Sequence, residues 1–333
     1  MKKRIIFVER QAHGAVSIER VFAQVARSLP TDLFDVEFHK LSYGHGLVGI
    51  LKGLLFFRKR QADIYHITGD IHYIALRLPK KKTVLTIHDL GFLHTNSGVR
   101  RSILKKLFLD LPLRVSENVT AVSNTTRDEI LSYFPGARDK IRVIENPLIA
   151  DFTPGREKPF DAECPVILQM GATKNKNIVN LINAVSELKC KLRIVGPLDA
   201  NIKGELEASG IHYENVDSID RHQIVEEYRN ADIVSFCSTY EGFGLPIIEA
   251  QAMRKPVITS ALPPMSDIAG GAAVLVDPFD PASIKNAVVK LIDDAGYRKN
   301  RVDMGTENIK RFDPKTIADQ YCELYLQILD GQN

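Results

Sequence analysis

Two glutamates lie beside a glycine-bearing loop within the stretch Cys237–Met253, with seven residues between them. Glu241 stands at the entrance of the loop, and Glu249 lies in the first turn of a predicted helix. Backbone N–H groups in such a loop and at a helix N-terminus can hold an anion such as a diphosphate. Carboxylates accept hydrogen bonds from hydroxyl groups. The two features together suit a sugar nucleotide, in which a diphosphate joins a ribose to a sugar.

The elements around these glutamates are a strand, a turn and a helix. The apolar run Asp232–Phe236 predicts a buried parallel strand. Gly242 and Gly244 permit a tight backbone path, and Pro246 suits the first position of a helix. Either glutamate alone could be an ordinary acid near a helix N-terminus, where the helix dipole favours it. The functional interpretation therefore depends on the whole string.

The string Tyr240-Glu-Gly-Phe-Gly-Leu-Pro-Ile-Ile-Glu-Ala250 resembles the E-x7-E motif of retaining glycosyltransferases of the GT-B fold, most closely those of family four. The resemblance covers most of residues 164–330 and part of the N-terminal half. It implies that Glu249 accepts hydrogen bonds from the ribose and that Glu241 accepts them from the donor sugar. It places the diphosphate against the N–H groups of Gly242, Phe243, Gly244 and Leu245.

A second loop, Gly171-Ala-Thr-Lys-Asn-Lys-Asn177, follows a predicted strand and precedes a predicted helix. Lysines at a helix N-terminus can pair with a phosphate. The loop resembles the family's glycine-to-Lys-Asn segment, which implies that Gly171 forms the turn and Lys176 binds the diphosphate. Family members often have an arginine one residue after the glycine. Ala172 stands there in this chain, which leaves Lys174 as the candidate substitute, and a solvated helix start remains the structural alternative.

His88 and Asp89 follow the predicted strand Thr83–Ile87, at the end of a strand where open α/β sheets place their ligands. They resemble the family's His-Asp motif. The resemblance implies that both residues lie near the donor sugar and the reacting centre, as catalytic residues together with Lys176 and Glu241.

Weaker candidates follow two other predicted strands of the N-terminal half. His66, Asp70 and His72 are expected to face one region and to line an acceptor site. The loop after the first strand, where family members usually have a glycine-rich segment, offers only His13 and Gly14. Gly14 is a candidate for donor contact and His13 for acceptor contact. The chain has no Gly-x-Gly-x-x-Gly string, which argues against a nicotinamide-dependent dehydrogenase.

Length and composition are those of a soluble globular protein of two domains, with 333 residues, 44% hydrophobic and 26% charged. No apolar run is long enough to span a membrane or to form a signal peptide. The four cysteines have neither metal-type nor disulfide-type spacing, which favours a reducing cytoplasm. The nine histidines show no ligand spacing, so we predict no metal and no cofactor, and family members need no bound divalent ion.

The net charge of +3 conceals an asymmetry between the two halves of the chain. Residues 1–150 carry 24 Lys and Arg against 14 Asp and Glu, whereas residues 151–333 carry 20 against 27. The predicted helices at residues 47–60 and 100–109 are apolar and bordered by cations, and such helices can lie in the interface of an anionic bilayer. An ordinary core-facing helix with a basic rim is the alternative. Nucleic acid is a poorer partner, because the chain lacks Trp and any basic tract with interleaved aromatic residues.

Apolar runs alternate with helical patterns along the whole chain, which predicts an α/β protein with two doubly wound, Rossmann-like domains facing a cleft. We expect an acceptor-side domain at residues 1–148 and a nucleotide-sugar-binding domain at residues 149–333, with a proline-bearing linker at Asn146–Phe160. In the resembled family the last helix, here residues 315–329, packs back on the N-terminal domain. The predicted strands are Arg4–Val8, Val36–Phe38, Ile64–Ile67, Thr83–Ile87, Val119–Val122, Arg142–Ile144, Val166–Met170, Leu192–Val195, Ile211–Tyr213, Ile233–Phe236, Val257–Thr259 and Ala273–Val276. The predicted helices are Ile18–Ser28, Leu47–Phe57, Ser102–Leu109, Thr126–Tyr133, Ile178–Leu188, His222–Arg229, Pro246–Met253, Ile284–Asp294 and Lys315–Leu329.

The expected activity is retaining transfer of a hexose-type sugar from a GDP- or UDP-sugar to a glycan or a lipid-linked acceptor. Surface polysaccharide synthesis is the expected setting, with the enzyme in the cytoplasm or peripherally on the membrane. The sequence leaves open a sugar-nucleotide epimerase or a phosphorylase of the same architecture, and a sugar-nucleotide-binding subunit without activity. A nucleotide-dependent enzyme unrelated to sugars fits less well, because it does not explain the paired glutamates.

Overall fold

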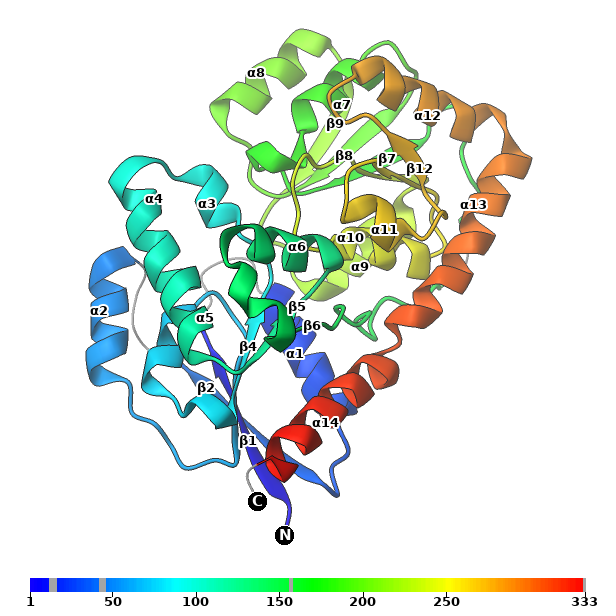
Figure 1. Ribbon diagram of the computed structural model, residues 1–333. Coiled ribbons are helices and arrows are strands. Elements are labelled where there is room, and N and C mark those ends of the chain that lie inside the picture. The colour runs from blue at the N-terminus through cyan, green and yellow to red at the C-terminus, as the bar shows by residue number, and fades with distance from the viewer. Residues whose placement is uncertain (12–16, 42–45, 156–157, 332–333) are drawn as a thin grey trace. The chain divides into compact units, whose positions relative to one another are not determined.

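The computed structural model describes residues 1–11, 17–41, 46–155 and 158–331, and it divides into two compact units. Unit 1 comprises Met1–Pro147 together with Asp313–Asn333, and unit 2 comprises Leu148–Phe312. Each unit contains one six-stranded sheet with helices packed on it, as Figure 1 shows. The predicted α/β class with two doubly wound, Rossmann-like halves is confirmed.

All six strands of unit 1 are parallel and lie in the order β2-β1-β3-β4-β5-β6. Their bounds are β1 Lys3–Glu9, β2 Phe34–Lys40, β3 Ile64–Ile67, β4 Thr83–Ile87, β5 Asn118–Ala121 and β6 Ile141–Val143. Its α-helices are α1 Ser17–Ser28, α2 Gly46–Phe56, α3 Gly91–Thr95, α4 Gly98–Lys105, α5 Leu111–Val115, α6 Asn124–Tyr133 and α14 Pro314–Asp330. A π-helical turn, Lys106–Asp110, joins α4 to α5.

The two faces of this sheet are covered by different helices, because successive side chains of a strand point to opposite faces. Phe7 of β1 packs edge-to-face on Phe22 of α1, and Phe22 in turn contacts Tyr321 of α14. The neighbouring residues Ile6 and Val8 belong to a separate core cluster that includes residues of α2 and α5. The chain therefore contributes its last helix to the first unit, where α14 packs beside α1.

The sheet of unit 2 is also parallel throughout, in the order β12-β11-β10-β7-β8-β9. Its strands are β7 Val166–Met170, β8 Lys191–Val195, β9 His212–Val216, β10 Ile233–Phe236, β11 Val257–Ser260 and β12 Val274–Val276. Its helices are α7 Ile178–Val185, α8 Ala200–Ser209, α9 Arg221–Asn230, α10 Leu245–Ala252, α11 Met265–Ala269, α12 Pro281–Asp293 and α13 Ala295–Asn308. Apolar residues of α7, α8 and α12 form one continuous core with β7, β8 and β10.

Each predicted strand corresponds to an observed one. The strands β1, β3, β4, β7 and β10 are buried along most of their length, and such strands appear in a sequence as largely apolar runs. Three helices of unit 2, α8, α11 and α13, escaped the sequence analysis, and α11 is only five residues long. Gly305 is the one buried residue of α13, and α8 buries only Ile202 and Leu206. Helices that bury so little show no apolar periodicity.

Candidate active site

The order of strands in unit 2 creates a switch point between β7 and β10. From β7 the chain continues on one side to β8 and β9, then returns to the other side of β7 to form β10, β11 and β12. Open α/β sheets bind ligands outside the carboxyl ends of the strands at such a point. The loop after β7 begins at Gly171 and the loop after β10 begins at Cys237, so both predicted donor loops start there.

The loop after β7 is held in a fixed path by glycine conformation and by a side-chain amide. Gly171 has a φ of +80°, and a Cβ there would meet the side chain of Lys176 at 3.3 Å. The Nε2 group of Gln169 donates to the carbonyls of Gly171, at 3.1 Å, and Lys176, at 3.2 Å. Asn177, with a left-handed φ of 58°, donates to the carbonyl of Cys237 at 3.1 Å. The loop therefore has little freedom to change shape around Lys176.

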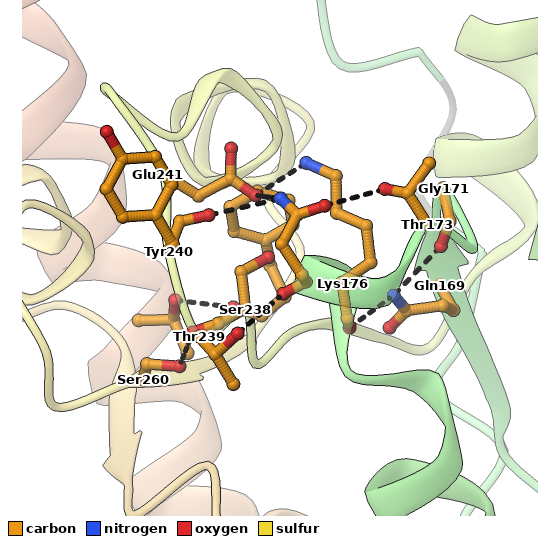
Figure 2. Close-up of polar contacts among 12 residues, drawn as sticks. Gln169, Gly171, Thr173, Lys176, Ser238, Thr239, Tyr240, Glu241 and Ser260 are labelled. Atoms are coloured by element: carbon orange, nitrogen blue, oxygen red, sulfur yellow. Dashed lines mark hydrogen bonds and ion pairs between the residues drawn. The ribbon is translucent and has the colours of Figure 1, made fainter. Parts of the chain in front are cut away.

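The two loops meet at an ion pair that neither motif predicts alone. The Nζ atom of Lys176 lies 2.6 Å from Oε1 of Glu241 (Figure 2). The same atom lies 4.6 Å from the ring centroid of Phe236. Asn175 Nδ2 donates to the same carboxylate oxygen at 3.2 Å and to the carbonyl of Tyr240 at 3.1 Å. The side chains of Lys176 and Glu241 are 20% and 15% exposed. The site thus combines an ammonium and a carboxylate that are largely shielded from water but still reachable.

The loop after β10 turns into α10 at Gly244, whose φ is +115°. A Cβ there would lie 3.1 Å from Cδ1 of Ile247. Glycine therefore suits this turn, because it tolerates a positive φ and has no Cβ to crowd Ile247. The N–H of Ile247 donates to the carbonyl of Gly244, and Pro246 has no N–H. Phe243 is 4% exposed and packs on Phe312 at 5.7 Å, which makes its side chain part of the core. The predicted N–H donors for an anion, those of residues 242–245, all precede Pro246.

Glu249 lies one residue further into α10 than expected, because the helix begins at Leu245 rather than at Pro246. Its Oε2 atom accepts a hydrogen bond of 2.7 Å from the hydroxyl of Tyr228 in α9. Tyr228 is fully buried, and burial together with the charge of Glu249 raises the pKa of its phenol well above the ordinary value. The tyrosine therefore remains a neutral donor that holds the carboxylate in place.

Sequence reasoning missed Asn175 and Tyr228. Asn175 was visible as part of the predicted loop, but nothing in a single sequence shows that its amide reaches Glu241. Tyr228 carries no motif signal at all. Of the other predicted donor residues, Lys174 is exposed in the same turn as Lys176 and Ala172 is buried, and a role for Lys174 in place of the family's arginine stays a prediction.

In unit 1 the structure places His88 and Asp89 directly after β4. His88 is 7% exposed, and its Nε2 atom lies 3.0 Å from the carbonyl oxygen of Thr68. The carboxylate of Asp89 is exposed and accepts a hydrogen bond of 2.7 Å from the N–H of Gly91. This contact with Thr68, the residue that follows β3, orients the ring of His88.

The three predicted acceptor residues of unit 1 do not face one region, which corrects that prediction. His66 is fully buried, with Nδ1 2.7 Å from the hydroxyl of Tyr325 and Nε2 2.7 Å from Oγ1 of Thr86. Burial lowers the pKa of its imidazole to about 3, so His66 is a neutral core residue. His72 is 2% exposed, and its Nδ1 atom lies 2.7 Å from the carbonyl oxygen of Phe108.

Asp70 is the one member of that group with an exposed side chain. Its carboxylate pairs at 2.8 Å with Arg10, which the sequence analysis did not single out. The Nε atom of Arg10 also pairs with Glu19 at 2.9 Å. His13 and Gly14 lie outside the described residues.

Two negative findings apply to the part of the chain that the structure describes. No helix there is long and apolar enough to cross a membrane. No three His, Cys, Asp or Glu side chains among the described residues are grouped as a metal site would require.

The chain matches two family models, Glycosyltransferase Family 4 over residues 19–152 and Glycosyl transferases group 1 over residues 155–311. O-antigen chain mannosyltransferase B of Escherichia coli is 26% identical over 293 residues, which cover 79% of this chain and 74% of that protein. A D-inositol 3-phosphate glycosyltransferase of Corynebacterium kroppenstedtii is 35% identical over 298 residues, covering 78% and 65%.

Solved structures share the fold. Anabaena Alr3699/HepE, crystallised with UDP and glucose, aligns with a TM-score of 0.79 at 17% identity, covering 98% of this chain and all of that one. Sucrose-phosphate synthase from Thermosynechococcus elongatus aligns with the same TM-score at 18% identity, covering 99% and 100%. The chain therefore belongs to the glycosyltransferases of group 1 and family four, and it is a glycosyltransferase of the GT-B fold.

Proposed function

We propose that this enzyme transfers a hexose, with mannose favoured, from a nucleoside diphosphate sugar to a hydroxyl of a glycan or lipid-linked acceptor, with retention of anomeric configuration. The observation that carries the proposal is the Lys176–Glu241 pair at the switch point between β7 and β10. Similar proteins named as O-antigen chain mannosyltransferases, from Escherichia coli and Salmonella typhimurium, support mannose and a role in surface polysaccharide synthesis.

The diphosphate of the donor is assigned to the ammonium of Lys176 and to the backbone N–H groups at Gly244 and Leu245. An ammonium has three N–H donors, so Lys176 can keep its bond to Glu241 and still donate to phosphate oxygens. The charge on the leaving diphosphate increases as the glycosidic bond breaks. Charge-assisted donors positioned for it lower the barrier more than they strengthen ground-state binding.

The two glutamates are assigned to hydroxyl groups on either side of the diphosphate. Oε1 of Glu241 accepts from Lys176 and Asn175, while Oε2 accepts no hydrogen bond among the described residues, which supports its use for a hydroxyl of the donor sugar. Glu249, held by Tyr228, is assigned to the ribose. His88 and Asp89 are assigned to the donor sugar.

The chemical step proposed is a front-face attack by the acceptor hydroxyl. The bond between the sugar's anomeric carbon and the diphosphate oxygen breaks, and the bond to the acceptor oxygen forms on the same face. The acceptor proton passes to the leaving diphosphate. No covalent intermediate is required, and Lys176 stabilises the charge that the departing group acquires.

Unit 1 is assigned to the acceptor and to contact with an anionic membrane surface. Helix α2 exposes five large apolar side chains, and the cations Arg58, Lys59 and Arg60 follow it. Helix α4 exposes Val99 and Ile103 beside Arg100. An apolar face next to clustered cations is the arrangement by which a helix binds an anionic bilayer interface.

The test uses the donor alone, since water can replace the acceptor. We expect calorimetry to show binding of GDP or UDP, and proton NMR to show slow hydrolysis of the corresponding sugar nucleotide with the α-anomer appearing first from an α-linked donor. The β-anomer appearing first would refute retention. Absence of binding for both nucleotides would refute the assigned donor site.

A further inference from the structure

Unit 1 contains a pocket of about 580 Å³ between α2 and α4. Its walls are mostly apolar and include Leu47 and Ile50 of α2, Val99 and Ile103 of α4, and the ring of Phe108 in the π-helical turn. The volume lies in the range of small-molecule sites, which are about 300–1,000 Å³. Nothing in the proposed chemistry of the donor uses this pocket.

One end of the pocket is polar and lies where ligands bind in open α/β sheets. Arg10 and Asp70, which pair at 2.8 Å, both line it. Arg10 directly follows β1, and Asp70 comes three residues after the end of β3. The chain passes from β1 to β2 on one side and to β3 on the other, so the gap between β1 and β3 is the switch point of this sheet. A guanidinium and a carboxylate side by side offer donors and an acceptor to hydroxyl groups.

Other lining residues belong to an exposed apolar surface. Leu47 is 54% exposed and Val99 is 77% exposed, although both line the pocket. Leu51 and Leu55 extend this apolar surface along α2 without lining the pocket. The lining thus combines a polar, hydroxyl-binding part with exposed apolar side chains next to cations, and this combination matches an amphiphile.

We propose that the pocket binds the hydrocarbon chain of an amphiphilic acceptor, with its hydroxyl-bearing head at Arg10 and Asp70. The assignment narrows the acceptor class of the proposed transfer reaction, on which it rests, to a sugar or polyol carried on a lipid. A second copy of this chain is a poorer occupant, because the cations beside the pocket would face the same cations of the partner.

The test measures binding of n-alkyl β-D-glucosides, from butyl to octyl, to the full-length protein by calorimetry below their micelle concentrations. Each buried methylene contributes about 0.8 kcal/mol, so affinity should rise about fourfold per methylene until the pocket is filled. An affinity that does not depend on chain length would overturn the proposal.

Two variants separate the pocket from the rest of the apolar surface. Ile103→Trp, at a position 38% exposed on α4, should fill the pocket and remove the dependence on chain length. Leu55→Ser, at a position 64% exposed on α2 but outside the pocket, should leave that dependence unchanged. If Ile103→Trp binds octyl glucoside like the wild type, or if Leu55→Ser loses binding equally, adsorption to the surface explains the data and the pocket assignment is wrong.

Two further measurements test the head group and the independence from the donor site. Asp70→Asn should weaken binding of octyl glucoside several-fold while leaving binding of 1-octanol unchanged; equal effects would refute the head-group assignment. GDP or UDP binding by Ile103→Trp should equal that of the wild type. If the wild type binds neither GDP nor UDP, the proposed function is wrong. If it binds a nucleotide but its affinity for alkyl glucosides does not depend on chain length, only this inference is wrong. If the wild type forms a dimer that Leu47→Ser dissociates, a second copy of the chain is the occupant of the pocket, and this inference is wrong as well.

Discussion

Replacement of Lys176 by methionine removes the ammonium while keeping an unbranched side chain of similar length. At about 4 Å, two unit charges interact by about 4 kcal/mol at an effective dielectric constant near 20. Loss of one positioned donor to a developing anion costs about 2.7–4 kcal/mol, or 10²–10³ in kcat. The Lys176 side chain is 20% exposed, so solvent screens part of this interaction. We therefore expect kcat to fall by roughly 10²-fold, which is the lower end of that range.

The same substitution has a structural cost that must be separated from the catalytic one. It leaves the carboxylate of Glu241, 15% exposed, without its cation. Breaking a fully buried ion pair costs about 3–5 kcal/mol and a surface pair about 0–1 kcal/mol, so a pair of intermediate exposure should cost about 1–2 kcal/mol of unfolding free energy. The double variant Lys176→Met, Glu241→Gln should recover most of this stability, because no charge remains unpaired.

The assay compares kcat, nucleotide affinity and unfolding free energy in the single and double variants. Nucleoside diphosphate release gives kcat, calorimetry gives affinity, and urea denaturation gives stability. Lys203→Met, an exposed position on α8, is the matched control for loss of one surface charge. The double variant should be stable but slow. If it turns over within about threefold of the wild type, Lys176 only stabilises the loop and the assignment to the leaving group fails.

Three further predictions concern Tyr228, Gly244 and His66. Tyr228→Phe removes the hydrogen bond to Glu249 and should weaken nucleotide binding about 3–10-fold with little change in kcat, measured by calorimetry and initial rates, consistent with about 1 kcal/mol for such a bond; unchanged affinity would separate Glu249 from the ribose. Gly244→Ala introduces a side chain at a φ of +115° and 3.1 Å from Ile247, so it should lower the melting temperature and weaken nucleotide binding together; a variant that keeps both would contradict the anion-binding turn. His66 has a pKa lowered to about 3 from 6.5, so its contribution to stability is complete above pH 6.5 and declines as the pH falls toward 3. The wild type should therefore lose about 1.4 kcal/mol more per pH unit than His66→Gln in that range, by urea denaturation; parallel pH profiles would refute this.

The central strands were predictable from the sequence, because a strand buried on both faces must be apolar along most of its length. A helix that buries a broad face is easier to recognise than a polar one. Helix α7, which buries five residues including Ile178 and Leu181, was recognised, whereas the polar α13 was not. The predicted helix Ser102–Leu109 spans two elements, because the π-helical turn after α4 changes the phase of the apolar positions.

The site was predictable as two motifs but not as a geometry. Gly171, Lys176, Glu241 and Glu249 were all singled out by residue type and context. The ion pair between Lys176 and Glu241 joins residues 65 positions apart, and it exists only because β7 and β10 are neighbours in the sheet. No local sequence pattern determines the order of strands in a sheet, so a single sequence cannot predict the distance between Lys176 and Glu241.

The error at His66 has a related physical cause. Its position near the carboxyl end of β3 suggested an exposed ligand group, since polar residues there commonly reach out of the sheet. The last helix of the chain, α14, covers this face, and Tyr325 and Tyr321 contact the imidazole. A residue about 260 positions away thus converts a candidate site residue into a buried hydrogen-bonding group. Burial of that kind is decided by which helix lies on which face, and for this unit the covering helix comes from the opposite end of the chain. Among the described residues no such helix covers Asp70, which lies beyond the carboxyl end of β3, and its side chain stays exposed whereas that of His66 is buried.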